Sequence, residues 1–293
     1  MSMDILQEKI RKLKNPTVID MTVTDNQIPL QISANAFSVL EAKKLYICTL
    51  MDALRETVPA VRFSFNTFAI DGAAGLCVLD ELLCAAKQNG YYVFLDAPDA
   101  LTQSQAEICA NAMLNEQSNW QFDSLLIGAY LGSNAIAPYA KKLDQQGKSL
   151  FALIRSANKS AAEIQDLLSG SRLVHMAAAE MITRFEKPSL TARNGYSNIG
   201  VIAAATAPES LRSLRERYKS TFLFVDGYDQ PAANAKNCSA AFDKLGHGAV
   251  VCAGSGVTAA WLKYNNDGDD YIRLALDAAE RMKKNLLRYI SIL

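Results

Sequence analysis

Short apolar runs alternate with amphipathic helical patterns along the whole chain, and this alternation constrains the fold most. Eight runs have the length and composition of buried strands, and a helical pattern follows each of them. Strands that alternate with helices pair in parallel through crossover connections. Eight such units in 293 residues favour a closed barrel over an open sheet. The predicted strands are 17–23, 60–65, 91–96, 124–128, 149–155, 199–205, 221–225 and 249–253.

The pattern therefore predicts the α/β class and a single (β/α)8 TIM barrel over residues 1–293, without an interdomain linker. A charged N-terminal helix is expected over 1–15, ahead of the first strand. The segment 186–198 is the least regular, and we expect a mobile loop near the barrel mouth there. The other predicted helices include 34–56, with Phe37 on its apolar face, 160–168, 171–185, 233–245 and 271–290.

Composition excludes several classes of protein. The 30 basic and 30 acidic residues balance, so no general attraction to nucleic acid or to an anionic membrane is expected. No long apolar span or signal peptide is present, which indicates a cytoplasmic protein. The six cysteines are scattered without a C-x-x-C pair, as expected for small buried thiols in a reducing compartment. No metal-binding or cofactor-binding motif appears, so neither a metal nor a cofactor is predicted.

The stretch 91–101 is the most informative about function. Five apolar or aromatic residues lead directly into Asp96, and the helical pattern 103–114 follows. A buried parallel strand that ends in a carboxylate is typical of the functional face of a barrel. This stretch resembles the third-strand signature of the orotidine 5′-phosphate decarboxylase family, in its longer bacterial subfamily. Asp96-Ala97 and the later Ser104-Gln105-Ala106-Glu107 carry the resemblance.

Further segments resemble the same family in the same order and spacing. Taken singly none is specific, but together they identify the chain as a member of the family. They are 72–76 after the second strand, 123–138 around the fourth, 155–165 after the fifth, 203–211, and 225–230, which is similar to a Pro-Gly-x-Gly-x-Gln loop.

The resemblance implies a known chemistry. Family members convert orotidine 5′-phosphate to uridine 5′-phosphate without metal or cofactor, which requires a carbanion to be stabilised and then protonated. An alternating Lys-Asp-Lys-Asp array does this, because preorganised charges in a dry site act strongly on developing charge. One aspartate of the array comes from the partner subunit, so the resemblance also implies a homodimer joined at the barrel mouths.

Only part of that array is retained. Asp20 matches the aspartate that contacts ribose, Arg62 stands for the first lysine, and Asp96 matches the central aspartate. Pro98 replaces the catalytic lysine, and Leu101 replaces the aspartate that reaches the partner subunit. General acid catalysis is typically worth ~10²–10⁴ in rate, so these two losses predict an impaired or inactive decarboxylase.

The ligand contacts are retained in a similar, partial way. The resemblance assigns Ser156 and Asn158 to ligand binding, while Ala157 stands where a serine would touch the pyrimidine. Gln230 keeps one phosphate contact, and Ser255 replaces the arginine that grips the phosphate. The N–H groups of the neighbouring glycines could still hold an anion, so a nucleotide monophosphate or another phosphorylated ligand is expected. Those neighbours are Gly254 and Gly256.

Three hypotheses about function remain open on the sequence. The first is a non-catalytic family member that binds a ligand or supports an active homologue. The second is an active decarboxylase with a rearranged site, in which Lys159 or Asp99 takes over a lost role. The third is a different barrel enzyme that uses Asp20, Arg62, Asp96 and Lys159 for new chemistry.

Overall fold

The computed structural model describes residues 2–116, 118–186, 193–264 and 267–293. Within these ranges eight strands form a closed barrel: β1 (Thr17–Asp20), β2 (Ala60–Ser64), β3 (Tyr92–Asp96), β4 (Ser124–Gly128), β5 (Ser149–Leu153), β8 (Ile199–Ala204), β9 (Leu223–Asp226) and β10 (Ala249–Ala253). Every neighbouring pair is parallel, and the order around the barrel is β1-β10-β9-β8-β5-β4-β3-β2. The predicted (β/α)8 TIM barrel is confirmed.

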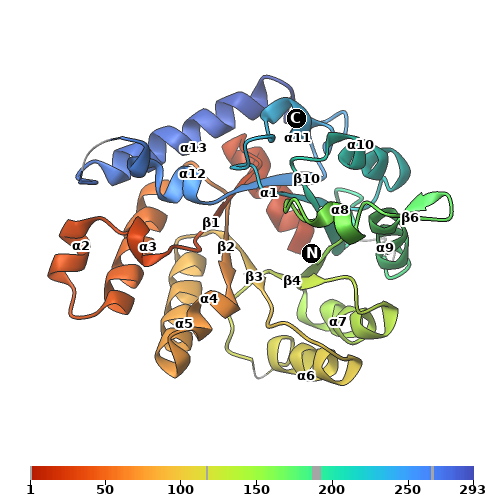
Figure 1. Ribbon diagram of the computed structural model, residues 1–293, viewed down its shortest axis with the longest axis horizontal. Helices are drawn as coiled ribbons and strands as arrows, with labels where there is room; N and C mark the ends of the chain where they lie inside the picture. Colours follow the sequence, from red (N-terminus) through yellow and green to blue (C-terminus); the bar gives the residue numbers. More distant parts are fainter. Residues whose placement is uncertain (1, 117, 187–192, 265–266) are drawn as a thin grey trace.

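Helices lie between the strands and surround the barrel (Figure 1). No helix in the described ranges is long and apolar enough to cross a bilayer. The helices are α1 (Ser2–Leu13), α2 (Leu30–Asn35), α3 (Val39–Leu54), α4 (Phe65–Ala69), α5 (Gly72–Gln88), α6 (Gln103–Met113), α7 (Ser133–Gln146), α8 (Ala161–Ile164), α9 (Val174–Thr183), α10 (Pro208–Arg217), α11 (Ala235–Ser239), α12 (Ser255–Thr258) and α13 (Tyr271–Leu287), with short 3₁₀ helices η1 (Asp25–Gln27) and η2 (Ala260–Lys263).

The strand register decides which side chains meet at the barrel mouth. β1 pairs with β2 so that Asp20 lies beside Arg62, and β2 pairs with β3 so that Ser64 lies beside Asp96. Side chains alternate between the two faces of a strand, so Arg62, Ser64 and Asp96 share one face. Strand pairing therefore brings Arg62 of β2 close to Asp20 and Asp96, the last residues of β1 and β3.

Aromatic rings fill the barrel beneath the mouth. Phe94 packs against Phe224 and Phe151, with ring centroids 5.0 and 5.6 Å apart, and all three side chains are fully buried. Edge-to-face packing of this kind stabilises a core beyond the area that it buries. These rings form an apolar floor on which the polar mouth residues rest.

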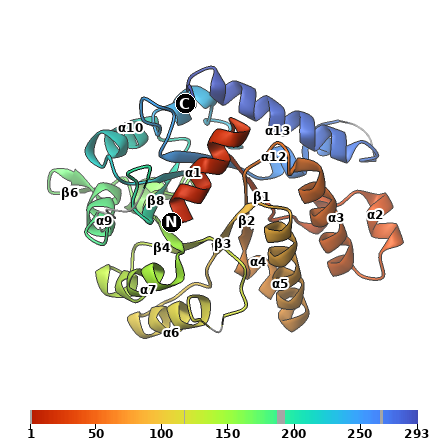
Figure 2. The same ribbon diagram turned by 180° about the vertical axis from the view of Figure 1, so that it is seen from behind.

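The opposite end of the barrel is closed by α1. Figure 2 shows this helix lying across the barrel. The hydroxyl of Ser2 hydrogen-bonds to that of Tyr92 at 2.6 Å, and Tyr92 also bonds to Ser124 and Ser149, at 2.6 and 2.8 Å. Buried hydroxyls require such partners. The N-terminal helix is thus fixed against the N-terminal ends of the strands, and the carboxyl ends remain free for a site.

The single helix predicted over 34–56 is wrong, because α2 and α3 are separate. Ser38 has extended backbone angles, and its side-chain oxygen accepts a hydrogen bond from the N–H of Glu41 at 3.1 Å. This is an N-cap, which begins a new helix at Val39. Phe37 consequently lies outside both helices and is 99% exposed, instead of facing the core.

Two later helical segments are also shorter than predicted. Residues 160–168 contain only the single turn α8, and a hairpin of β6 (Leu168–Ser169) and β7 (Arg172–Leu173) precedes α9. Gly170, with φ of +65°, provides its two-residue turn. Residues 233–245 contain only α11. Beyond it the Asp243 carboxylate accepts hydrogen bonds from two later N–H groups and stabilises a turn.

Six of the thirteen residues of the predicted mobile loop at 186–198, namely 187–192, lie outside the described residues. Its predicted place near the barrel mouth is wrong for the described part, because the side chain of Asn194 donates a 2.8 Å hydrogen bond to Asp4 of α1, at the opposite end of the barrel.

Candidate functional site at the barrel mouth

Arg62 is the centre of the mouth. Its guanidinium forms two parallel hydrogen bonds with Asp96, from Nε to Oδ1 at 2.8 Å and from Nη2 to Oδ2 at 2.6 Å. This bidentate geometry is the strongest that an arginine and a carboxylate adopt. The guanidinium carbon also lies 5.9 Å from the centre of the Phe224 ring. The side chain is thus held in one position above the apolar floor.

Two more carboxylates surround the same guanidinium. Nη1 of Arg62 lies 3.2 Å from Oδ1 of Asp226 and 3.6 Å from Oδ2 of Asp20. Each of the four side chains is less than a third exposed. With all groups ionised, three negative charges face one positive charge, so the cluster is strongly acidic. We call Asp20, Arg62, Asp96 and Asp226 the mouth cluster.

The ionisation of the mouth cluster reflects burial and crowding. Burial favours the neutral guanidine, but the nearby carboxylates outweigh it and hold the pKa of Arg62 well above its usual range. Burial raises the pKa of Asp96, its pair with Arg62 opposes this rise, and Asp20 and Asp226 add to it. An arginine in this setting stays charged and cannot act as a proton donor.

A cavity of about 410 Å³ adjoins the mouth cluster. Arg62, Asp96 and Asp226 line its polar side, and Pro98 lines it close by. Asp99 also lines it and accepts a 3.1 Å hydrogen bond from Asn66. No lysine or histidine appears among its described lining residues. Its other walls are apolar or aromatic and include Leu126, Ile127, Tyr130, Leu131, Tyr139, Leu153 and Ile202.

Several predicted site residues do not reach this cavity. Leu101 is 77% exposed and lies outside the lining. Ser156, Asn158 and Lys159 follow β5 on a loop that does not line it either. That loop packs against the one after β9, where a Cβ added to Gly227 would lie 2.4 Å from that of Ala157. The small side chain at position 157 thus permits this close approach.

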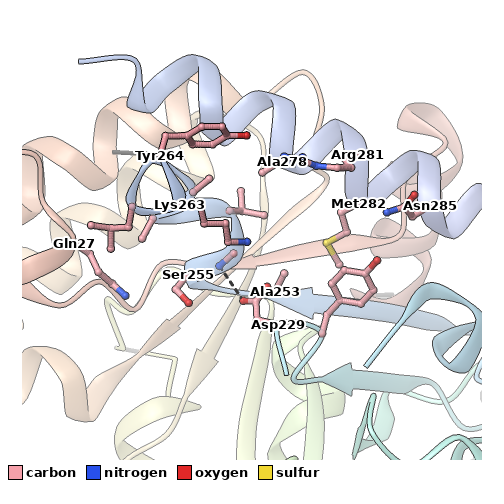
Figure 3. A pocket seen from close by; sticks show the side chains of 16 residues that line it. Gln27, Asp229, Ala253, Ser255, Lys263, Tyr264, Ala278, Arg281, Met282 and Asn285 are labelled. Carbon is pink, nitrogen blue, oxygen red and sulfur yellow. Dashed lines mark hydrogen bonds between the residues drawn. The ribbon is translucent and has the colours of Figure 1, made fainter. Parts of the chain in front are cut away.

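A second cavity, of about 580 Å³, lies among α12, η2 and α13 (Figure 3). Ser255 and Gly256 line it, as does Asp229 from the loop after β9. Gln230, the predicted phosphate contact, is exposed and absent from the lining of either cavity. The predicted ligand contacts after β10 therefore belong to a cavity different from the one beside Arg62.

The Asp229 carboxylate occupies the N–H groups that the sequence assigns to an anion. Its Oδ2 accepts hydrogen bonds from the N–H of Gly254 at 2.6 Å and from that of Gly256 at 3.2 Å. Figure 3 shows the second of these contacts beside Ser255. The chain thus supplies a carboxylate of its own at this position.

No protein-family model matches the chain. A search of curated proteins, however, finds the orotidine 5′-phosphate decarboxylase of Rhodopirellula baltica, 31% identical over 218 residues, which cover 73% of this chain and 72% of the relative. The chain belongs to the orotidine 5′-phosphate decarboxylase family. The enzyme of that name from Clostridium novyi is 25% identical over 97% of this chain and 98% of its own.

Solved structures agree on the fold. A putative orotidine 5′-phosphate decarboxylase from Streptomyces avermitilis superposes with a TM-score of 0.79 over 99% of this chain and 95% of its own, at 18% identity. A putative orotidine-monophosphate-decarboxylase from Toxoplasma gondii superposes with a TM-score of 0.77 over 98% of this chain and 97% of its own, at 18% identity. At 18% identity these structural similarities show a shared barrel fold and nothing about activity.

Compared with the family pattern, this chain has two acidic residues that the sequence analysis missed. Asp226 and Asp229 lie in 225–230, the segment similar to the Pro-Gly-x-Gly-x-Gln loop, whose specified positions contain no acidic residue. A signal for Asp226 was present, because it ends an apolar strand just as Asp20 and Asp96 do. Nothing in the sequence signals the contact of Asp229, since it depends on how two loops meet.

Among the described residues no three His, Cys, Asp or Glu side chains are arranged so that they could hold a metal ion. The mouth carboxylates are instead directed at Arg62.

Proposed function

We propose that this orotidine 5′-phosphate decarboxylase-like barrel does not decarboxylate orotidine 5′-phosphate and serves as a ligand-binding member of its family. The observation that supports this most is the lining of the mouth cavity, where Pro98 and Arg62 stand at the two lysine positions. The reaction ends with a proton delivered to a carbanion. A guanidinium at neutral pH does not release one, and proline has none to give.

The charge balance of the mouth cluster also opposes the reaction. Asp96 is engaged through both of its oxygens by Arg62, so its charge is not free to act on a substrate carboxylate. Asp226 adds a further negative charge 3.2 Å from the guanidinium. Catalysis of decarboxylation requires fixed positive charge where the carbanion forms. A cluster with excess negative charge would destabilise it.

A direct assay tests this proposal. Purified protein and the Clostridium novyi relative are incubated separately with orotidine 5′-phosphate, and its loss is followed to saturation. We expect no turnover above the uncatalysed background for this chain. Turnover in the ordinary enzyme range of ~1–10³ s⁻¹ would refute the proposal and would mean that a residue outside the matched positions donates the proton.

We further propose that the chain forms a homodimer through its mouth face. Exposed apolar side chains lie in the segments that connect consecutive barrel strands: Phe37 between β1 and β2, Ile70 between β2 and β3, and Leu101 between β3 and β4, exposed by 99, 83 and 77%. Apolar residues gathered on one face are typical of a protein interface. Leu101 then lies where the family resemblance expects contact with the partner subunit.

Sedimentation velocity tests the dimer. The 32.0 kDa chain is expected to sediment as a dimer at micromolar concentration. Phe37→Asp is expected to shift it towards monomer, because a charge buried in an apolar interface loses its hydration. Leu245→Asp is the matched control, since Leu245 is 48% exposed but precedes β10 at the other end of the barrel. A wild-type monomer, or equal dissociation by both variants, would contradict the proposal.

A further inference from the structure

The contact between Asp229 and the loop after β10 is unusually close. A Cβ added to Gly256 would lie 2.1 Å from Oδ1 of Asp229, so only glycine admits the carboxylate at this position. A Cβ at Gly254 would stand 3.6 Å from that of Asp20, which links this loop to the mouth cluster. Both glycines are therefore suited to an anion that approaches the backbone, and here the anion is a side chain of the same protein.

The position of this contact in the barrel matters for ligand choice. In (β/α)8 barrels that bind phosphate, the loops after the last two strands and a short extra helix commonly form the phosphate site. Here those loops follow β9 and β10, and they contribute Asp229 and its two N–H partners. A phosphate of a ligand would have to displace a tethered carboxylate, which is present at a high effective concentration.

We propose that Asp229 is a specificity-determining residue that makes this barrel select a ligand without a phosphate group. This inference rests on the proposed function, because an enzyme acting on orotidine 5′-phosphate would have to accept one. The ligand class that fits the mouth is neutral or cationic with an apolar body. The 410 Å³ cavity combines apolar and aromatic walls with Arg62, Asp96 and Asp226 of the mouth cluster. The opposing hypothesis is the prediction from the sequence, that the barrel binds a phosphorylated ligand.

Cationic residues near Asp229 make the proposal testable by gain of function. Lys263 and Arg281 line the same 580 Å³ cavity, and Figure 3 shows the Lys263 amine and the Asp229 carboxylate directed into it. Neither cation forms an ion pair within the part of the chain that the structure describes. With the charge at 229 removed, these cations and the freed N–H groups would attract an anion.

The experiment uses calorimetric titration of the full chain with uridine 5′-phosphate and with inorganic phosphate. For the wild type we expect dissociation constants above about 1 mM. The tethered carboxylate of Asp229, at an effective concentration in the millimolar range, competes with the probe for the same N–H groups. Asp229→Asn is expected to bind uridine 5′-phosphate at least ~10-fold more tightly, because the repulsive charge is removed and the remaining amide oxygen is a weaker acceptor than the carboxylate. Asp229→Ser is a second variant, and circular dichroism checks that each is folded.

Asp277→Asn is the matched control. It removes the same charge from α13, the helix that carries Arg281, at a side chain outside the cavity. We expect no change in binding from it. Wild-type binding of either probe below ~100 µM would overturn the inference, and so would failure of both Asp229 variants to gain binding. Binding without turnover would overturn this inference alone, whereas turnover would refute the proposed function as well.

Discussion

Replacing Pro98 by lysine and Leu101 by aspartate together is expected to raise kcat for orotidine 5′-phosphate by ~10²-fold or more over the wild-type rate. The lower bound comes from general acid catalysis alone, which is typically worth ~10²–10⁴. The lysine would supply the missing proton two positions after Asp96, and the aspartate would restore the charge expected from the partner subunit. Both changes act on the transition state, so kcat should respond more than KM.

The structure offers room for this reconstruction. Pro98 lies in irregular chain after β3 and lines the cavity beside Asp96, so lysine there faces the site without interrupting a strand. Leu101 is exposed and outside the lining, so an aspartate at 101 could act only in a neighbouring subunit. We therefore expect the double variant to exceed the sum of the single ones, because groups that act as a unit are non-additive.

The matched control is Pro98→Lys with Leu101→Asn, which retains the lysine and the size of the side chain but not its charge. It should recover much less activity than the double variant. Adding Ser255→Arg is expected mainly to lower KM, and more so with Asp229→Asn, since the carboxylate of Asp229 lies beside that position. If kcat at saturating substrate stays at the wild-type level in the double variant, the assignment of positions 98 and 101 is wrong.

The fold was predictable because its signal is repeated. Each barrel strand is an apolar run bounded by turn residues, and the predicted limits of Ser124–Gly128 and Ala249–Ala253 agree with the structure. Helix ends were less predictable, since local side-chain hydrogen bonds decide them. Ser38 begins a new helix within an unbroken helical pattern, and Asp243 stabilises a turn where the pattern continues.

The sequence predicted which residues of the site lie close together only where those residues lie at the ends of strands. Asp20, Arg62 and Asp96 meet because they lie at or near the carboxyl ends of three neighbouring strands, and pairing in register follows from the fold. The contact of Asp229 with Gly254 and Gly256 depends on the path of two loops, which no periodic pattern encodes. Family resemblance also drew attention to residues that this chain lacks, whereas the mouth cluster is defined equally by Asp226, which the resemblance does not mark.

Replacement of Arg62 by methionine is expected to lower the free energy of unfolding by about 3 kcal/mol at pH 7. Methionine retains much of the side-chain volume but leaves three carboxylates facing one another without a cation. Removing one partner of a buried ion pair typically costs ~3–5 kcal/mol. The lower end of this range applies because the Arg62 side chain is 19% exposed and so only partly buried. Chemical denaturation measures the change.

The dependence of this loss on pH identifies its cause. Burial raises the pKa of Asp96, and the charges of Asp20 and Asp226 add to this rise, while the pair with Arg62 opposes it. Without Arg62 that opposition is lost, so the pKa of Asp96 rises further above its unfolded value. A group whose pKa is raised on folding contributes stability below its unfolded pKa and loses it as pH rises through the folded value. The difference in free energy of unfolding between the wild type and Arg62→Met should therefore shrink as the pH falls from 7 towards about 4. That pH is near the unfolded pKa of aspartate.

Arg155→Met is the matched control for this dependence. Arg155 makes the same bidentate contact, at 3.1 and 2.9 Å, but with the single carboxylate of Asp166. Its loss leaves no group of mutually repelling carboxylates. We therefore expect Arg155→Met to lower the free energy of unfolding by less than Arg62→Met does, and to regain less of it as the pH falls. Equal pH profiles for the two variants would mean that Arg62 stabilises the barrel through its pair with Asp96 alone. In that case Asp20 and Asp226 would be free to meet a cationic part of a ligand, because their charges would not be needed to hold the guanidinium.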